Sequence, residues 1–336
     1  MDAQLTGVAT GVGSLPGTDI DAAWATTFDE LPELPHLPEL PGRGPGADMI
    51  GRTAVQLVGL AVDRTPSGWR LVDRAGADQR AALELLATDL DALLPVAAPG
   101  YDGPLKVQLA GPWTLAAALE LPRGGRALRD RGAVADVIAS LAEAVAEHVT
   151  DIRRRVPRAR LVLQLDEPGL PAVLAGRVPT ESGFGTLRVP DTADVESALR
   201  AVIAAAGGRV AVHCCAADAP LRMFRAAGAA AVGVDLTLGG VNHDDLGELV
   251  EAGTALWLGA VPALGPGVPP TPRAVADPVR RLWRELGFAP ERLPESVALT
   301  PSCGLAGASQ GWVSSAYRVL RQASNALLEA PEGIIT

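Results

Sequence analysis

A histidine and two cysteines end a run of small apolar residues in "VAVHCCAADAP", residues 210–220. Side chains of an extended strand alternate between its two faces, so His213 and Cys215 are expected to point together and Cys214 to point away. Imidazole and thiolate are both zinc ligands, whereas a buried thiol without a metal packs as a small apolar residue. The spacing is compatible with a metal site at His213 and Cys215, and equally with a hydrogen-bonded histidine beside packed thiols.

Two other segments add possible ligands. "AAVGVDLTLGG" ends a predicted strand at Asp235, and "ALTPSCGLAG" places Cys303 just after another. Nitrogen, thiolate and carboxylate ligands in this combination suit tetrahedral zinc. Their spread over three strand ends is unlike a structural zinc site, in which paired C-x2-C ligands are usual. The alternatives are that Asp235 caps the next helix and that Cys303 is a buried small residue.

Two further segments indicate a substrate site. In "LQLDEPGL", Asp166 ends a predicted strand and could hold a substrate ammonium group or act as a helix N-cap, and Glu167 is expected in the first turn of the next helix. In "GVGSLPGTD", Gly13 and Ser14 are small enough for a ligand to approach the backbone. No G-x-G-x-x-G pattern is present there, so no dinucleotide site is predicted. Trp113 is the one tryptophan placed to flank a substrate.

Short apolar runs alternate with amphipathic segments along the chain, and this alternation positions the candidate residues. Strands are predicted at residues 7–13, 34–37, 105–109, 161–165, 209–213, 231–235, 255–260 and 297–300. Helices are predicted between them, for example at 133–155 and 191–206. The pattern predicts an α/β fold, a (β/α)8 TIM barrel formed as a single domain by residues 1–336, with a doubly wound sheet as the alternative. Strand carboxyl ends share one face of such a barrel, where active sites are built.

Composition excludes several classes of function. The chain is 48 % hydrophobic and 20 % charged, which favours a packed globular protein, and its net charge of −10 without a basic cluster argues against a nucleic-acid partner. The uncharged stretch 254–272 contains five prolines and three glycines, so a membrane helix is not expected. The N-terminus lacks a basic region followed by an apolar one, and three cysteines make no disulfide framework. We therefore expect a cytoplasmic protein.

Several segments together resemble the C-terminal catalytic half of cobalamin-independent methionine synthase. They are "GVGSLPGT", "DMIGR", "VQLAGPWTLA", "LQLDEPGL", "VHCCA", "GVDLTL", "LGAV" and "TPSCGL", and they run nearly from end to end. The resemblance implies a (β/α)8 barrel with a catalytic zinc that activates homocysteine for methylation. It implies zinc ligands at these positions: His213, Cys215, Cys303 and Asp235, the last where the family usually has glutamate. It also implies homocysteine binding by the backbone of Val12, Gly13 and Ser14 and by the carboxylate of Asp166.

The chain differs from this family at residues that act on the methyl donor. The family's proton-donor histidine follows the seventh strand, but the corresponding loop, "GAVPALGPGVPPTP", contains none. Ala118 and Ala172 stand near positions where the long enzymes hold folate with tryptophan and glutamate. Because a methylfolate donor needs an acid at its leaving nitrogen and a methyl-corrinoid does not, we expect a corrinoid, free or carried by a protein, or another small methyl carrier. His243 could be a replacement acid or simply start a helix.

Other functions compete with this interpretation. The protein could be a zinc-dependent methyltransferase for another thiol, and a carboxylate at Asp166 favours an amino-acid acceptor over one without an ammonium group. A metal-free barrel of the uroporphyrinogen decarboxylase type would leave the convergence of His213, Cys215 and Cys303 unexplained. A zinc-binding barrel without catalysis is a third possibility, since the family's acid is missing.

Overall fold

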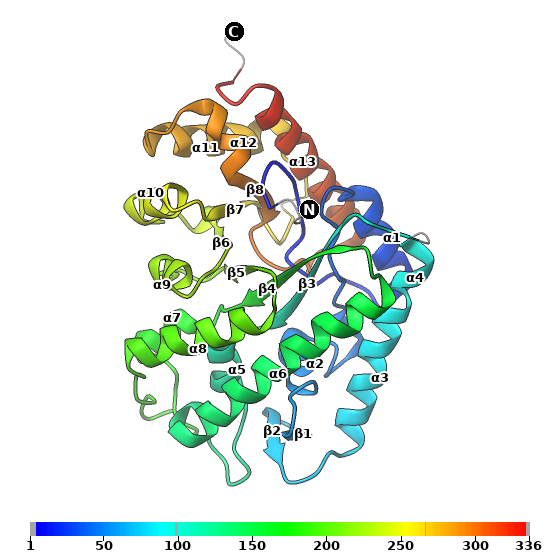
Figure 1. The fold of residues 1–336 in the computed structure, drawn as a ribbon, viewed down its shortest axis with the longest axis vertical. Helices are drawn as coiled ribbons and strands as arrows, with labels where there is room; N and C mark the ends of the chain where they lie inside the picture. Colours follow the sequence, from blue (N-terminus) through cyan, green and yellow to red (C-terminus); the bar gives the residue numbers. More distant parts are fainter. Residues whose placement is uncertain (1–4, 98–99, 266, 334–336) are drawn as a thin grey trace.

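The computed structural model describes residues 5–97, 100–265 and 267–333. Its centre is a curled parallel sheet of six strands, and Figure 1 shows helices along the outside of this sheet. The strands are β3 (Pro104–Ala110), β4 (Arg160–Asp166), β5 (Arg209–Cys214), β6 (Ala231–Asp235), β7 (Ala255–Val261) and β8 (Val297–Pro301). They pair in the order β3-β4-β5-β6-β7-β8. This order runs in one direction, whereas a doubly wound sheet reverses at a switch point, so that alternative was wrong.

Helices follow the strands as the alternation predicts. The α-helices are α1 (Ile20–Glu30), α2 (Met49–Ala54), α3 (Ala77–Asp91), α4 (Leu93–Val96), α5 (Pro112–Ala118), α6 (Arg131–Arg155), α7 (Leu170–Leu174), α8 (Thr192–Ala205), α9 (Leu221–Ala226), α10 (His243–Glu251), α11 (Pro272–Glu285), α12 (Leu293–Ser296) and α13 (Gln310–Glu329). The described residues also form four short 3-10 helices, η1 (Pro41–Arg43), η2 (Ala127–Arg129), η3 (Leu236–Leu238) and η4 (Pro290–Arg292). The helices predicted at 133–155 and 191–206 are confirmed as α6 and α8. Within the described ranges, no helix combines the length and the apolarity needed to cross a bilayer.

The two N-terminal segments predicted as strands, 7–13 and 34–37, are extended but not regular strands. The first pairs with β8, where Gly7 N donates to Val297 O at 2.7 Å and Thr10 N donates to Leu299 O at 3.0 Å. The second makes a single parallel bridge to β3 at His36. Proline has no N–H to donate, and the prolines that flank His36 in "LPHLPE" keep this second pairing short.

These two segments also bond to each other. Leu15 N donates to Glu39 O at 2.8 Å, and Glu39 N donates to Gly13 O at 3.1 Å. The packing of the two segments against each other and against α13 depends on Gly11, because a Cβ there would overlap His36 Nε2 and the Tyr317 hydroxyl. Backbone hydrogen bonds therefore link β8 to the first segment, the first segment to the second, and the second segment to β3.

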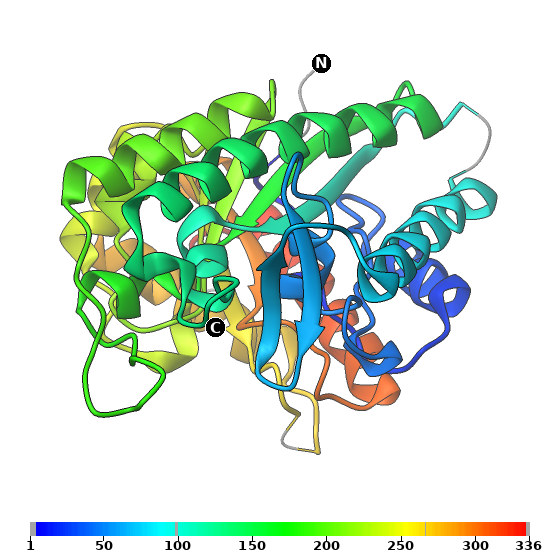
Figure 2. The same ribbon diagram turned by 90° about the horizontal axis from the view of Figure 1, so that it is seen from below.

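An antiparallel hairpin that the sequence pattern did not predict extends from this frame. It consists of β1 (Ala61–Thr65) and β2 (Gly68–Val72). Glu120, after α5, accepts hydrogen bonds from Ser67 Oγ at 2.6 Å and from Arg70 Nη2 at 2.7 Å. Figure 2 shows the hairpin on the same side of the molecule as the loop that follows β7.

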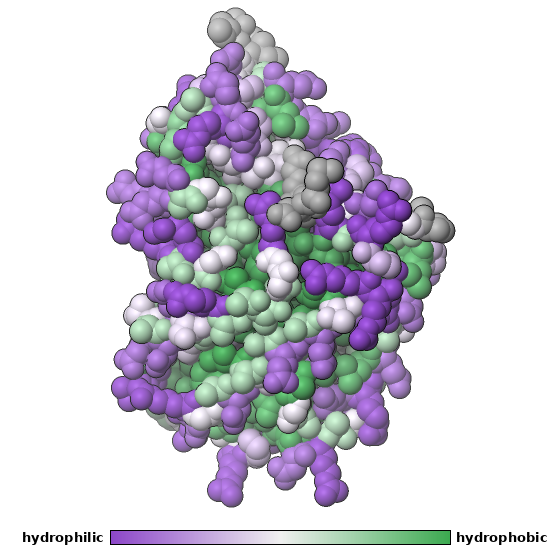
Figure 3. Space-filling view, in the orientation of Figure 1, coloured by the Kyte–Doolittle hydropathy of each residue, from purple (hydrophilic) through white to green (hydrophobic). Residues whose placement is uncertain are grey.

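The interior of the sheet changes from apolar to polar along the strands. Near the strand starts, a buried apolar cluster includes Val162, Ala211 and Trp257. From Lys106 in the middle of β3 toward the carboxyl ends, the buried residues include several polar ones: Lys106, Gln108, Gln164, Asp166 and His213. Figure 3 shows green apolar surface in the middle of one outer face, framed by purple hydrophilic residues. Polar residues are mostly exposed in folded proteins, so packing alone does not explain the buried polar layer inside the sheet.

Candidate functional site

Two of the predicted ligands meet at the carboxyl ends of β5 and β8. Cys215 Sγ and Cys303 Sγ lie 2.9 Å apart, and both residues are partly exposed. The hydrogen bond with Cys303 and burial raise the pKa of Cys215, whereas the hydrogen bond with Cys215 and the nearby His213 lower the pKa of Cys303 to about 6. Either sulfur can be the donor in this hydrogen bond. Cys214 is fully buried in the core, which confirms its predicted packing role.

A hydrogen-bonded chain joins His213 to the N-terminal segment. Asp166 Oδ1 is 2.9 Å from His213 Nδ1 and accepts from Gln164 Nε2 at 2.7 Å. Gln164 Nε2 also donates to Val12 O, and Lys106 Nζ donates to both Val12 O and Gln164 Oε1, each at 2.8 Å. A carboxylate at Nδ1 orients the ring and leaves Nε2 for a ligand. Asp166 therefore orients His213 and is not the helix N-cap that the sequence left open.

The predicted substrate loop lies beside the thiol pair. Leu305 N, two residues after Cys303, donates to Ser14 O at 2.7 Å, and a Cβ on Gly304 would overlap Ser14 Oγ. Gly13 packs against Gln108, because a Cβ on Gly13 would lie 2.9 Å from Gln108 Nε2. The structure thus brings Val12, Gly13 and Ser14 to the same end of the sheet as Cys303.

Sequence reasoning missed a second carboxylate, Glu39, and its neighbours. Glu39 is 4 % exposed, and Gln108 Nε2 donates to its Oε1 at 3.1 Å. Burial raises the pKa of Glu39 to about 7 against the opposing effect of Arg52, and the charge of Asp166 raises it further. Burial also lowers the pKa of Lys106 to about 7. A fully buried lysine beside two acidic groups rarely serves packing alone, but this burial is visible only in the structure, so the sequence carries no signal for the layer.

Glu167 has a different position from the one predicted. It lies before α7 and caps α5 instead, accepting from Trp113 N at 2.9 Å, Thr114 N at 2.8 Å and Thr114 Oγ1 at 2.7 Å. Burial raises its pKa to about 7, and the three donors act in the opposite direction. Its own N–H donates to His213 O at 2.8 Å. Glu167 therefore ties α5 to the strand that carries His213.

Asp235 does not join the cluster. Its Oδ1 accepts from Thr237 N at 2.7 Å and from Thr237 Oγ1 at 2.6 Å, so it caps η3 as the alternative interpretation held. In the parts of the chain that are described, no three or more His, Cys, Asp or Glu residues form a group that could hold a metal ion. The predicted tetrad is thus only partly assembled: the two thiols meet, His213 is oriented nearby, and Asp235 is engaged elsewhere.

The thiol pair can still be compared with what zinc needs. Tetrahedral zinc with two sulfur ligands at about 2.3 Å places the sulfurs about 3.8 Å apart. The observed 2.9 Å is shorter, so the sulfurs would have to separate by about 0.9 Å, which side-chain rotation can supply for partly exposed residues. Two thiols with a carboxylate-oriented imidazole suit zinc in type, and the residues present fit a zinc ion apart from Asp235.

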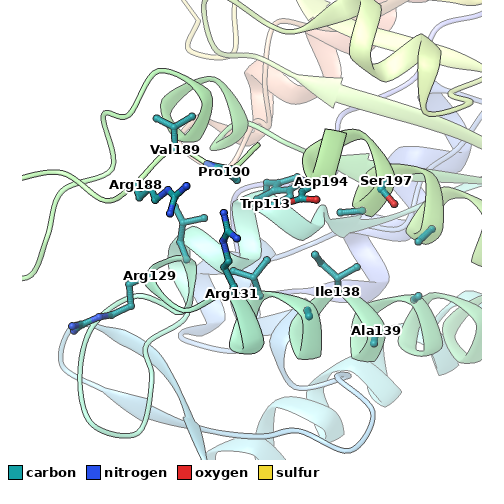
Figure 4. A pocket seen from close by; sticks show the side chains of 16 residues that line it. Trp113, Arg129, Arg131, Ile138, Ala139, Arg188, Val189, Pro190, Asp194 and Ser197 are labelled. Carbon is teal, nitrogen blue, oxygen red and sulfur yellow. The ribbon is translucent and has the colours of Figure 1, made fainter. Parts of the chain in front are cut away.

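Trp113 and His243 lie away from this cluster. Trp113 is 2 % exposed, its Nε1 donates to Val195 O, and it lines an outer cavity of about 520 Å³ between α6 and α8. Figure 4 shows Arg131 and Arg188 extending toward each other over that cavity. The ring lines this outer cavity, and a role for Trp113 beside the substrate stays a prediction. His243 begins α10 behind the Asn242 cap, 3.9 Å from Glu285.

Active sites of parallel α/β sheets lie at the strand carboxyl ends, and the thiol pair, His213 and the buried polar layer all lie there. Fold and site together define an α/β enzyme whose candidate site contains a pair of thiols.

Comparison with known proteins gives the family. The family model "cobalamin-independent synthase, catalytic domain" matches residues 103–326. The chain belongs to this family and is an enzyme of the methionine synthase type, which transfers a methyl group to homocysteine. The matched region contains Asp166, His213, Cys215, Asp235 and Cys303.

One solved structure shares the fold. A B12-independent methionine synthase from Shewanella sp. W3-18-1, solved in complex with selenomethionine, has a TM-score of 0.61 at 12 % identity, over 95 % of this chain and 97 % of that one. The Amycolatopsis orientalis BexX/CysO complex has a TM-score of 0.36 at 14 % identity, over 97 % of this chain and 91 % of that one, and a score of this size does not establish a shared fold. No curated protein matches the chain.

Proposed function

We propose that the protein is a zinc-dependent methyltransferase that methylates the thiol of homocysteine to give methionine. The observation that carries the proposal is the meeting of Cys215 and Cys303, 88 residues apart, beside the Asp166–His213 pair. His213, Cys215 and Cys303 would hold the zinc. Asp235 would be the fourth ligand after its carboxylate turns away from Thr237. A zinc ion with two thiolate ligands keeps an added substrate sulfur deprotonated yet nucleophilic.

The residues of this chain would bind and orient the substrate. Asp166 Oδ1 is occupied by His213 and Gln164, and Oδ2 makes no hydrogen bond among the described residues, which leaves it for the ammonium group of homocysteine. The backbone of Val12, Gly13 and Ser14 would approach the amino-acid end, with Val12 O fixed by Lys106. The sulfur then attacks the donor's methyl carbon, and the electron pair of the breaking bond leaves with the donor.

The fold completes this site in our proposal. We infer that the extended segments 7–13 and 34–37 close the six-stranded sheet into an eight-stranded barrel, because they carry hydrogen bonds from β8 to β3. The whole chain would then be one barrel domain. All strand carboxyl ends would open onto one mouth, which places Ser14 and Cys303 together.

The methyl donor is proposed to be a corrinoid, or another carrier whose leaving group needs no proton. The described residues of the loop after β7, 262–265 and 267–271, include no acidic or basic side chain. His243, the predicted replacement acid, is half-exposed and close to Glu285, not to the thiols. A methylfolate donor would require a positioned acid at its leaving nitrogen.

A donor comparison tests the proposal. Zinc-loaded protein is supplied with homocysteine and either methylcobalamin or methyltetrahydrofolate, and methionine is measured. Methionine from the corrinoid is expected, with loss of turnover in Cys303→Ala. Turnover with methylfolate alone would contradict the donor assignment. If the wild type binds one zinc ion per chain but gives no turnover with any donor, the protein is a catalytically silent zinc-binding barrel. If turnover occurs only with another thiol, that thiol replaces homocysteine as the methyl acceptor.

A further inference from the structure

Gln108 has one buried polar atom whose partner is missing. Its Nε2 donates to Leu37 O at 2.7 Å and to Glu39 Oε1 at 3.1 Å, and its Oε1 is buried without a hydrogen-bond partner. The residue as a whole is 2 % exposed. Turning the amide over would place its oxygen against two acceptor oxygens, so the Nε2 contacts fix the direction in which Oε1 points. A buried acceptor in this state costs about 1–3 kcal/mol unless something donates to it.

The place of this atom relates it to the substrate. Gln108 and Gln164 are partners in the parallel register of β3 and β4, and Ala110 pairs with Asp166 one step nearer the carboxyl ends. Strand spacing and rise put the Cα atoms of Gln108 and Asp166 about 8 Å apart on the same face. Gly13, in the proposed substrate loop, packs directly against the Gln108 amide. Gln108 therefore contacts the proposed substrate loop and shares a face of the sheet with the carboxylate that would bind the ammonium group.

We propose that Gln108 Oε1 accepts a hydrogen bond from the α-ammonium group of the thiol substrate, and so determines specificity for an amino-acid thiol. This inference rests on the proposed function. An ammonium group has three N–H donors, and Asp166 Oδ2 satisfies only one of them. Gln108 supplies a second acceptor, which Glu39 and Leu37 hold in place from the far side of the amide. A thiol without an amino group would leave Oε1 unpaired, which is how a polar site rejects an analogue.

Equilibrium binding without a methyl donor tests this inference. The dissociation constants of homocysteine and 4-mercaptobutyrate, which lacks only the amino group, are measured by calorimetry on the zinc-loaded wild type and on Gln108→Met. The wild type is expected to prefer homocysteine. Gln108→Met should weaken homocysteine binding about tenfold to hundredfold and leave 4-mercaptobutyrate unchanged, because a hydrogen bond to a charged group is lost only for homocysteine.

A matched control separates recognition from packing. Gln79 is also a buried glutamine, but it accepts from Val62 N and donates to Val55 O, away from the site. Gln79→Met should keep the wild-type preference. If Gln108→Met does not fold, Gln108→Leu provides the second variant, with thermal unfolding measured for both.

The outcomes distinguish the two levels of the argument. A wild type that binds both thiols equally overturns the proposal that homocysteine is the methyl acceptor. A wild type that prefers homocysteine, together with a folded Gln108→Met or Gln108→Leu that keeps the same preference, overturns the role of Gln108 alone. Equal weakening of both thiols in the variants also overturns it, because that is the result of a purely structural role.

Discussion

The cap that Glu167 places on α5 makes a strong prediction about stability. Its carboxylate is fully buried and accepts three hydrogen bonds, two of them from the backbone N–H groups of Trp113 and Thr114. Glu167→Ala removes both backbone acceptors, and each buried donor left unpaired costs about 1–3 kcal/mol. The hydroxyl of Thr114 can turn to another acceptor and still accepts from Gly169 N. We therefore expect a loss of about 2–6 kcal/mol, larger than for an ordinary exposed helix cap.

Urea unfolding followed by far-UV circular dichroism and tryptophan fluorescence measures this loss. Thr114→Val is the matched control, because it removes the hydroxyl of the same cluster and leaves one backbone donor, Gly169 N, without its acceptor, so it should cost about 1–3 kcal/mol. Glu167→Gln, which keeps one acceptor oxygen, should fall between the two. The reasoning would be refuted if Glu167→Ala lost less free energy of unfolding than Thr114→Val.

Three further predictions concern the carboxyl layer, the barrel closure and the metal. Burial raises the pKa of Glu39 to about 7, so between pH 4.5 and 7 the folded state binds a proton that the unfolded state has lost, and stability falls as pH rises. The free energy of unfolding of Glu39→Gln, measured with urea, should therefore rise by up to about 3 kcal/mol relative to that of the wild type between pH 5 and pH 8. A difference between the two proteins that does not change with pH would contradict this. Gly11→Ala should lower the melting temperature through overlap with Tyr317, costing about 1–3 kcal/mol, and adding Tyr317→Phe should restore part of the loss. Asp235→Ala should lower the affinity for zinc, because the proposed function has this carboxylate leave Thr237 to bind the metal. A variant that binds zinc as tightly as the wild type would show that Asp235 only caps η3.

The main features of the fold could be predicted because strand period and strand–helix alternation are local signals. The bounds predicted for β6 are the observed ones, and the other five strands differ by at most one residue at either end. Parallel strands share a carboxyl end, so the meeting of Cys215 with Cys303 followed from the order of elements alone. The prolines around His36 interrupt the hydrogen-bond ladder, so the second segment forms only a bridge.

The parts of the site that were missed depend on distant partners. Lys106 and Gln108 alternate with apolar residues, a pattern typical of a strand with one face in water, yet both face the interior. Glu167 caps a helix that begins 55 residues earlier in the chain, which spacing along its own segment cannot indicate. The sequence could not decide whether Asp235 caps the next helix or binds a metal, because both roles use the same carboxylate.

The metal's coordination tests the central claim most directly. X-ray absorption at the zinc edge is measured on the purified protein before and after addition of homocysteine. We predict two sulfur ligands from Cys215 and Cys303 together with nitrogen from His213, and a third sulfur when homocysteine is added. A Cys303→Ala variant should show one sulfur fewer. Zinc without sulfur ligands, or a sulfur count unchanged by homocysteine, would contradict the account.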